Sequence, residues 1–440
     1  MSGGRGATGR EWRNWTGDQV CTPAAIERPR TREELVDAIG RAVAAGRTVK
    51  VPGAGHSFSE AALTDGVMID LGGLRRVLDA DASSGLVKVQ GGIVLHELNR
   101  ELHARGRAMA NLGDIDSQTI SGAISTATHG TGTGLQNISA QVAAVELVTA
   151  GGEVCELGAG DPDPTGFLAA GVGLGALGAI SAVTLRTVPA FTLHRVDEPL
   201  PLDDVLGGFE QLANANDHFE FFVFPYTDQA LTIRRNRTNA PLRPRSRLNV
   251  LVNERLMQDK VGDLMFRFTA RFGRLIPWLA RISARFLSEG DYIDHSFNIF
   301  SSLRTLRFTE MEWAVPRANG PEAVRRVLDW VAAERYPVAF PLECRAVAAD
   351  DALLSPSFER DVFYIAVHQY RGMEWRPYFQ AVQSIMGEYG GRPHWGKRHM
   401  LTRDALAERY PRFGDFLAVR DRLDPARVFA NAYTERCLGP

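Results

Sequence analysis

Cysteine is scarce in this sequence, and the few cysteines are far apart. The 440 residues contain four of them, Cys21, Cys155, Cys344 and Cys437, and no C-x-x-C pair occurs. Structural zinc sites and disulfide frameworks depend on closely or regularly spaced cysteines. We therefore expect neither, predict no metal site, and favour a reducing compartment such as the cytoplasm.

Long apolar runs and long basic runs are lacking as well. No stretch reaches the roughly 18 consecutive apolar residues that a membrane-spanning helix requires. Residues 1–10 have no apolar core of the kind found in a secretory signal. The formal charge is −2 and no long block of lysine and arginine occurs. These features argue against a nucleic-acid partner and against a spanning helix.

The sequence does contain enough apolar material for more than one core. Apolar residues make up 45% of the chain and charged residues 23%, and 440 residues exceed the usual size of a single core. Residues 1–14 are rich in glycine and are predicted to be disordered. Helical and strand patterns alternate through residues 15–189, whereas residues 190–440 combine strands and helices with long loops. We predict an α+β protein of two domains, the second built on a mainly antiparallel sheet.

The first of several glycine-rich stretches follows a predicted strand at residues 48–51. It reads Pro-Gly-Ala-Gly-His-Ser at residues 52–57, with the imidazole of His56 inside the loop. Successive free N–H groups in such a turn form a concave site suited to a pyrophosphate. The stretch is neither a Walker A loop nor a G-x-G-x-x-G motif. Taken alone, it also fits an ordinary strand-to-helix turn.

Two further stretches are rich in small residues. Residues 121–134 read Ser-Gly-Ala-Ile-Ser-Thr-Ala-Thr-His-Gly-Thr-Gly-Thr-Gly and follow a polar loop at residues 111–120. This density of glycine and hydroxyl side chains suits a cofactor better than a hydrophobic core. Residues 171–186 form a glycine-rich turn that runs into a predicted strand. Its small residues would allow close approach either of an adenosine or of a neighbouring element.

Charged residues on predicted strands provide the candidates for chemistry. Glu343 and Arg345 alternate within residues 338–347, so both side chains point to the same face of the strand. Their neighbours are mostly apolar, and enclosed charges need a partner or a purpose. The alternative is an ordinary surface ion pair. Glu310 and Glu312 also alternate within residues 308–315, but the sequence assigns no role to them.

Together these motifs resemble the flavoproteins of the vanillyl-alcohol-oxidase type, in their aldonolactone and alditol oxidase branch. The matching stretches are residues 52–57, 121–132, 343–345 and 394–397, and the resemblance runs from about Trp15 to Tyr433. It implies a two-subdomain FAD-binding domain of the PCMH type at residues 15–189. It also implies an α+β cap domain for the substrate at residues 190–440, of which residues 423–440 return to the flavin.

The resemblance further implies that FAD is attached covalently to His56. A neutral imidazole is a competent nucleophile, although a simple hydrogen bond to the loop backbone is the alternative for His56. The residues predicted to contact FAD are Pro52, Gly53, Ala54, Gly55, His56, Ser57, Gly113, Asp114, Ser117, Ser121, Gly122, Ser125, Thr126, His129, Gly130, Gly175, Gly178, Ile180 and Asn431.

The catalytic residues implied are Glu343, Arg345 and Lys397, with His368 as a further candidate. Arg345 is permanently cationic, which suits an anionic reduced flavin. Glu343 suits a hydrogen bond to a substrate hydroxyl. Lys397 would supply a second donor, or would accept the proton if burial lowers its pKa. His394 and His399 are interpreted as structural residues.

The substrates implied are sugar lactones, namely L-gulono-, L-galactono- or D-arabinono-1,4-lactone, or open polyols. Residues 346–350 resemble the alditol branch, but residues 308–316 resemble the lactone branch, which we favour. Asp114 departs from relatives that have a small neutral residue beside Gly113. A glycine at position 113 is predicted to leave room for oxygen. Oxygen, a quinone or a cytochrome is therefore expected as the electron acceptor.

Two other functions are weighed against an enzyme. A flavin- or nucleotide-binding protein without turnover would not need Glu343, Arg345 and Lys397 together. A peripheral membrane protein would use residues 264–287, where arginines recur within a helical pattern that Pro277 is expected to kink. That helix would otherwise cover the protein's own core while its arginines reach the solvent.

Overall fold

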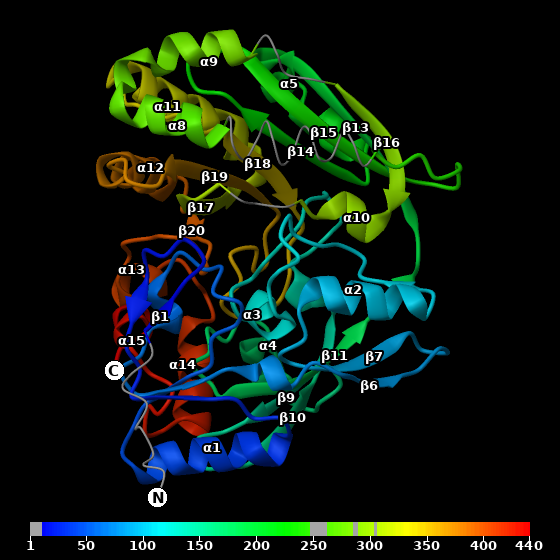
Figure 1. Ribbon diagram of the computed structural model, residues 1–440, viewed down its shortest axis with the longest axis vertical. Helices are drawn as coiled ribbons and strands as arrows, with labels where there is room; N and C mark the ends of the chain where they lie inside the picture. Colours follow the sequence, from blue (N-terminus) through cyan, green and yellow to red (C-terminus); the bar gives the residue numbers. More distant parts are fainter. Residues whose placement is uncertain (1–10, 247–261, 285–288, 303–305) are drawn as a thin grey trace, which may run out of the picture.

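The computed structural model describes residues 11–246, 262–284, 289–302 and 306–440. Figure 1 shows a lower half made of several small sheets with helices around them, and an upper half dominated by one large sheet. Within the described ranges, no helix is long and apolar enough to cross a bilayer.

The lower half begins with a small parallel sheet. Its strands are β3 (Ala25–Glu27), β4 (Val49–Lys50) and β5 (Val67–Ile69), in the order β3-β5-β4, and α1 (Arg32–Ala44) belongs to this unit. The hydroxyl of Thr31 accepts a hydrogen bond from the Glu34 N–H and so caps the start of α1. The apolar face of α1 packs against this sheet.

A five-stranded antiparallel sheet forms the other part of the lower half. Its order is β10-β9-β11-β7-β6. The strands are β6 (Val77–Ala80), β7 (Leu86–Gln90), β9 (Val142–Val148), β10 (Val154–Gly158) and β11 (Ala179–Arg186). Short helices cover it, namely α2 (Leu95–Ala104), α3 (Ile120–Ser125) and α4 (Thr165–Ala170). The antiparallel strands β9 and β10 form a hairpin around residues 150–152.

The upper half is an eight-stranded sheet in the order β16-β13-β15-β14-β18-β19-β17-β20, with neighbouring strands antiparallel. The strands are β13 (Thr192–Pro201), β14 (His218–Val223), β15 (Gln229–Thr238), β16 (Gly290–His295), β17 (Phe308–Pro316), β18 (Leu342–Val347), β19 (Val362–Tyr370) and β20 (Arg392–Pro393). Helices of this half include α5 (Leu202–Gly207), α6 (Phe209–Asn214), α10 (Ser296–Phe300), α11 (Gly320–Ala333) and α12 (Arg376–Glu388). The predicted antiparallel sheet is confirmed.

Alternation along the central strands separates an apolar face from a polar one. On β17, Met311 and Trp313 enter the main hydrophobic cluster, whereas Glu310 and Glu312 point to the opposite side. The same rule applies to β14, β18 and β19, so the polar side chains of four neighbouring strands gather on one face. Both faces are covered, and the polar side chains are therefore buried.

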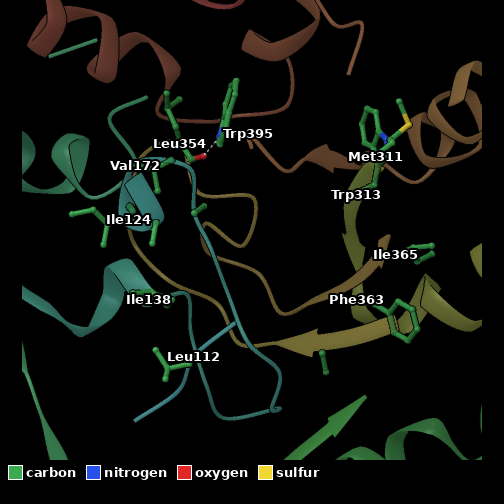
Figure 2. Packing of buried hydrophobic residues seen from close by; sticks show 14 of the residues in the cluster. Leu112, Ile124, Ile138, Val172, Met311, Trp313, Leu354, Phe363, Ile365 and Trp395 are labelled. Atoms are coloured by element: carbon green, nitrogen blue, oxygen red, sulfur yellow. Dashed lines mark hydrogen bonds between the residues drawn. The ribbon is translucent and has the colours of Figure 1, made fainter. Parts of the chain in front are cut away.

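One hydrophobic cluster extends through both halves. Figure 2 shows Leu112, Ile124 and Val172 of the lower half together with Met311 and Phe363 of the large sheet. A shared core of this kind fixes the loops of the lower half relative to the polar face of the sheet.

The C-terminal residues return to the lower half. Helices α13 (Arg403–Ala407), α14 (Phe413–Leu423) and α15 (Ala432–Leu438) lie beside it in Figure 1. The Val49 N–H donates to the Val428 carbonyl at 2.7 Å. The Asn431 amide donates to the carbonyls of Glu60, Ala61 and Leu63 at 2.9–3.2 Å. The chain end therefore supports the segment that follows the loop at residues 52–59.

Two predictions need correction. Residues 1–10 lie outside the described residues, but Trp12–Arg13 form β1, which pairs with β2 (Val20–Cys21), so the predicted disorder does not extend to residue 14. The helix predicted at residues 264–287 is two helices, α8 (Gly262–Arg271) and α9 (Ile276–Ala284). The break lies at Phe272, whose backbone is not helical, whereas Pro277 stands in the first turn of α9, where proline is tolerated. Residues 285–287 lie outside the described part.

Candidate active site

A groove runs through the lower half between the glycine-rich loops. Its empty volume is about 990 Å³, open mouth included. The predicted residues that line it are Pro52, Gly53, Ala54, Gly55, His56, Ser57, Ser121, Gly122, Ser125, Thr126, Gly175, Gly178 and Ile180. Three stretches that are far apart in the sequence therefore meet around one space.

The glycines of the first loop allow it to lie against the second. A Cβ atom at Gly53 would come within 2.6 Å of the Thr119 hydroxyl, and Gly55 has a φ of +73°, where other residues are strained. Thr119 itself caps α3 by accepting a hydrogen bond from the Gly122 N–H at 3.2 Å. The wall of the groove is thus largely backbone and small side chains, which suits a phosphate-containing cofactor.

His56 has one nitrogen engaged and one unused. Its Nε2 lies 2.8 Å from the Ser117 hydroxyl, whereas its Nδ1 is buried without a hydrogen-bond partner. The indole of Trp15 stacks on the ring at 5.5 Å between centroids. Burial, with a smaller effect of Lys397, lowers the pKa of His56 below its ordinary value. A neutral imidazole with an unpaired nitrogen in a cofactor groove fits the predicted attachment to a flavin.

A second cavity adjoins the groove on the side of the large sheet. Its empty volume is about 560 Å³, and Gln118 lines both spaces. The predicted residues that line it are Gly113, Asp114, His129, Glu343, Arg345, His368 and Lys397, joined by Ile115, Gln118, Thr128, Phe308, Glu310, Glu312 and His394. The structure therefore brings all four predicted catalytic residues together.

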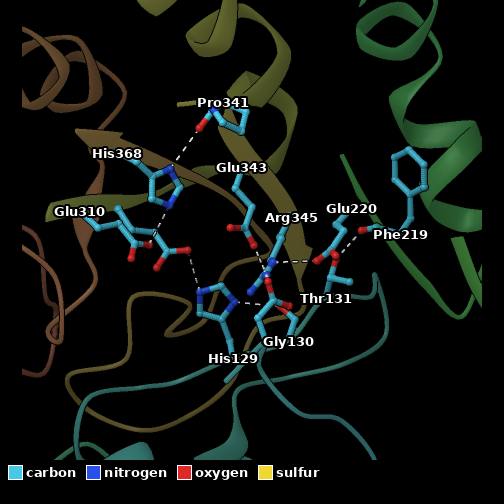
Figure 3. A network of polar contacts seen from close by, with 12 residues as sticks. His129, Gly130, Thr131, Phe219, Glu220, Glu310, Pro341, Glu343, Arg345 and His368 are labelled. Atoms are coloured by element: carbon cyan, nitrogen blue, oxygen red, sulfur yellow. Dashed lines mark hydrogen bonds and ion pairs between the residues drawn. The ribbon is translucent and has the colours of Figure 1, made fainter. Parts of the chain in front are cut away.

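Arg345 is held by three carboxylates, and Figure 3 shows two of them, Glu220 and Glu343, beside its side chain. Its guanidinium contacts Asp114 at 2.5 Å, Glu220 at 2.9 Å, and Glu343. Glu220 also accepts from Arg235 at 2.6 Å. Burial alone would lower the pKa of Arg345, but Asp114, Glu343 and Glu220 outweigh it and raise that pKa well above the ordinary value. Arg345 is thus a fixed cation whose charge is already balanced.

Lys397 reaches the cavity from the edge of β17. The His394 N–H donates to the Glu312 carbonyl, and the Arg398 N–H donates to the Glu310 carbonyl, both at 3.0 Å. These bonds direct the Lys397 ammonium to Glu310 and leave it 3.9 Å from Glu312. The two alternating glutamates are therefore the partners of Lys397.

His129 lies behind the glutamates on the lower-half side. Its Nδ1 is 2.9 Å from the Gly130 carbonyl, its Nε2 is 3.2 Å from Glu312, and its ring stacks on Tyr364 at 3.7 Å. Burial would raise the pKa of Glu312, but His129 and then Lys397 outweigh it and lower that pKa well below the ordinary value. Glu312 is an anion, therefore, despite being buried.

His394 lies beside His129 and Glu312. Burial lowers its pKa to about 3, so the ring is neutral at physiological pH. His129, Glu312 and His394 lie close enough together to ligate a metal ion, but the nearby ammonium of Lys397 would repel one.

Three predicted cofactor residues line neither cavity. Ser117 instead bonds to His56. A Cβ at Gly130 would lie 2.3 Å from the Asn111 side chain, so this glycine permits close packing of two loops. Asn431 supports the backbone of residues 60–63 rather than the groove itself. His129, predicted to contact FAD, lines the second cavity.

Several residues of the site were not predicted. Glu310 and Glu312 carry the same signal as Glu343 and Arg345, namely charges that alternate along an otherwise apolar strand. Lys50 is buried in the wall of the groove and donates to the carbonyls of Phe429 at 3.0 Å and Gly175 at 3.3 Å. Burial, followed by the charge of Arg420, lowers the pKa of Lys50 to about 7. The sequence carries no signal for Lys50, because its partners come from distant segments.

Two family models match parts of this chain. A model of the D-arabinono-1,4-lactone oxidase family matches residues 183–437, and a model of the FAD binding domain matches residues 23–158. The chain is 50% identical over 429 residues to a Mycobacterium tuberculosis protein named L-gulono-1,4-lactone dehydrogenase, covering 98% of this chain and 99% of the relative. It is 34% identical over 442 residues to L-gulonolactone oxidase of Bos taurus, with 98% and 99% covered.

A solved structure shares the fold. The crystal structure of cholesterol oxidase from B. sterolicum superposes with a TM-score of 0.82 at 17% identity, covering 98% of this chain and 97% of that chain. The predicted α+β fold and the resemblance to flavoproteins of the aldonolactone branch are thereby confirmed. The chain belongs to the D-arabinono-1,4-lactone oxidase family and includes an FAD binding domain.

Proposed function

We propose that the protein uses FAD to oxidise a secondary alcohol of an aldono-1,4-lactone, with L-gulono-, L-galactono- and D-arabinono-1,4-lactone as candidates. The observation that supports this most is the junction of the two cavities. A groove of glycine-rich backbone shares the lining residue Gln118 with a neighbouring cavity that is lined by Glu343, Arg345, His368 and Lys397. The name of the relative with 50% identity supports a lactone over a polyol.

The residues of the chain would bind and orient both molecules. Residues 52–57 and 121–126 would hold FAD. When bound, FAD supplies the group that accepts a hydride from a carbon that carries a hydroxyl. Glu343, Lys397 and His368 would position the substrate hydroxyls in the second cavity. Arg345 would keep a fixed positive charge beside them, and Asp114 and Glu220 would hold its guanidinium in place.

The test of this function is anaerobic mixing of the yellow protein with a panel of lactones and polyols. We expect an aldono-1,4-lactone to bleach the flavin absorbance faster than any polyol does. Faster bleaching by a polyol would identify an alditol oxidase instead. A flavin that no member of the panel bleaches would indicate a binding protein without turnover.

We also propose that FAD is linked covalently to His56 through Nδ1. The unpaired, buried Nδ1 and the hydrogen bond that orients Nε2 support this assignment. The proposed division of the chain is an FAD-binding domain at residues 15–189 and a cap domain at residues 190–440. The segment at residues 423–440 would support the flavin groove from behind.

The electron acceptor is proposed to include oxygen, with a quinone or a cytochrome as alternatives. Gly113 lines the second cavity, but a Cβ at this position would meet the His129 carbonyl at 3.0 Å and the Thr128 methyl at 3.2 Å. The Gly113→Ala methyl would therefore press on the cavity wall as well as occupy space. We expect slow reaction of the reduced wild type with oxygen and a still slower reaction in Gly113→Ala, with lactone-driven reduction largely retained.

Stopped-flow reoxidation with dissolved oxygen measures this effect. Gly134→Ala is the matched control, because a Cβ at Gly134 meets no atom within 4 Å. A Gly113→Ala/Thr128→Ser double variant removes the Thr128 methyl group that would crowd the new side chain. It therefore distinguishes an effect of displacing the cavity wall from an effect of filling the space that oxygen needs. Equal reoxidation rates in Gly113→Ala and the wild type would show that this position does not control access of oxygen.

A peripheral contact with an anionic membrane is proposed for α8 and α9 in a cytoplasmic protein. Apolar side chains of this segment are exposed, with Trp278 on α9 at 61% and Phe272, between the two helices, at 51%, and arginines lie among them. The cysteines of the chain are free thiols, which suits a reducing compartment.

Flotation with vesicles tests the membrane contact. The wild type is expected to float with vesicles that contain phosphatidylglycerol, and the Phe272→Ser/Trp278→Ser variant is expected to lose most of this binding. Leu78→Ser is the control, since Leu78 is 48% exposed on a distant strand. Flotation of the double variant at the wild-type level would exclude these helices as the contact.

A further inference from the structure

In the part of the chain that the structure describes, each basic side chain of the Arg345 network and the second cavity already contacts a carboxylate. These side chains are Arg235, Arg345 and Lys397. The carboxylates are Asp114, Glu220, Glu310, Glu312 and Glu343, two more than the basic side chains. Protons on both His129 and His368 would only bring the total to neutrality. The cavity is thus neutral or negative.

The substrate class proposed above exists in a neutral and an anionic form. In water a sugar 1,4-lactone exchanges with its open-chain hydroxy acid, which is a carboxylate at neutral pH. The open acid keeps every hydroxyl group of the lactone and gains one at C4, so hydrogen bonds to the shared hydroxyls alone would not separate the two forms. An arginine in the cavity would ordinarily attract the carboxylate form in bidentate fashion.

We propose that Asp114 and Glu220 make the site selective for the neutral, closed lactone by occupying the guanidinium of Arg345 that an open aldonate would otherwise bind. Asp114 contacts Nη2 of Arg345 at 2.5 Å, and Glu220 contacts its Nε at 2.9 Å. Glu220 also forms an ion pair with Arg235. Glu343 contacts Nη2 from the same strand as Arg345. These contacts leave only Nη1 without a carboxylate, so an aldonate would meet a single nitrogen in place of a bidentate pair and would stand beside three carboxylates, which is costly in a buried site.

Of the residues around Arg345, Asp114 has the clearest access to the ligand. It lines the second cavity, whereas Glu220 lies on the neighbouring strand β14 behind the guanidinium. Glu343 is a candidate for contact with the substrate itself. Asp114 is therefore the position at which selectivity against the aldonate can be tested with the least change to the rest of the site.

The experiment compares two open-chain ligands that differ only in charge. L-gulonate and its neutral amide, L-gulonamide, are titrated into the oxidised holoenzyme, and binding is followed through the flavin absorbance and through inhibition of L-gulono-1,4-lactone oxidation. We expect the wild type to bind gulonate about 100-fold or more weakly than gulonamide. In Asp114→Asn the ratio of the gulonate dissociation constant to the gulonamide dissociation constant should shrink about tenfold or more. This is the scale expected when one charge is removed at close range.

Asp116→Asn is the matched control. It removes the same charge two positions away, where the carboxylate contacts the Ser301 hydroxyl at 3.1 Å and does not line the cavity. The gulonate-to-gulonamide ratio in this variant should equal that of the wild type. Flavin content and thermal midpoint establish that each variant is folded.

The inference depends on the proposed function, but the two can fail separately. Bleaching by no lactone would overturn the function, whereas the titrations with gulonate and gulonamide would still report on charge. Wild-type protein that binds gulonate as well as gulonamide would overturn the inference, whether or not any variant folds. An unchanged ratio in folded Asp114→Asn would remove Asp114 as the selective residue.

Discussion

Replacement of Arg345 or Lys397 by alanine should slow lactone-driven flavin reduction by about 100-fold or more. This is the scale for removing one preorganised group that stabilises charge in a transition state. Arg345 has its geometry fixed by three carboxylates, and Lys397 is held by Glu310 and Glu312, so both are preorganised. Anaerobic stopped-flow reduction measures the rate, and flavin content measures cofactor binding, which should change far less.

The Arg345→Ala variant also leaves buried carboxylates without their cation, which would destabilise the protein. An Arg345→Ala/Asp114→Asn double variant removes one of these charges and should recover thermal stability without recovering the reduction rate. Arg326→Ala is a control, because Arg326 pairs with Glu388 on the surface. Normal reduction rates in both alanine variants would remove Arg345 and Lys397 from the active site.

His56→Ala should abolish covalent attachment of FAD altogether. After acid precipitation of the wild type, the yellow colour should stay with the protein, because His56 offers an unpaired Nδ1 in the groove. In His56→Ala all flavin should appear in the supernatant. Ser117→Ala should give partial attachment, since the Ser117 hydroxyl orients the imidazole through Nε2.

Another histidine serves as the control for this chemistry. His194→Ala removes an imidazole that pairs with Asp291 on the cap, far from the groove. This variant should retain the wild-type amount of protein-bound flavin after acid precipitation. No cysteine lies between Cys21 and Cys155, so a second attachment from the loops at residues 52–57 or 121–134 is not expected. Release of all flavin from fully loaded wild type would show that the link to His56 does not form.

Local patterns predicted much of the fold. Alternation along the predicted strands at residues 308–315 and 338–347 placed the charges of each strand on one face. The structure confirms both strands as β17 and β18, although β18 begins only at Leu342. Glycine-rich loops were recognised because backbone conformation and close approach demand particular residue types at particular positions. Such signals are local, and a sequence displays them directly.

The charge balance of the site was not predictable in the same way. Arg345 was expected to be a cation with one partner on its own strand, but Asp114 and Glu220 approach it from a loop and from β14. Those contacts depend on sheet order and on the packing of two halves. The break at Phe272 was missed for a different reason: proline is an evident helix breaker, whereas Phe272 carries no such local signal.

The support that the chain end gives to the groove has a consequence for the order of assembly. Lys50 in the groove wall bonds to the Phe429 carbonyl, and Asn431 bonds to residues 60–63, contacts that join positions more than 360 apart in the sequence. During synthesis the flavin loops emerge long before these partners do. The cofactor pocket is therefore completed only after residues 429–431 have been synthesised, and full retention of FAD becomes a property of a chain that includes them rather than of the first domain alone.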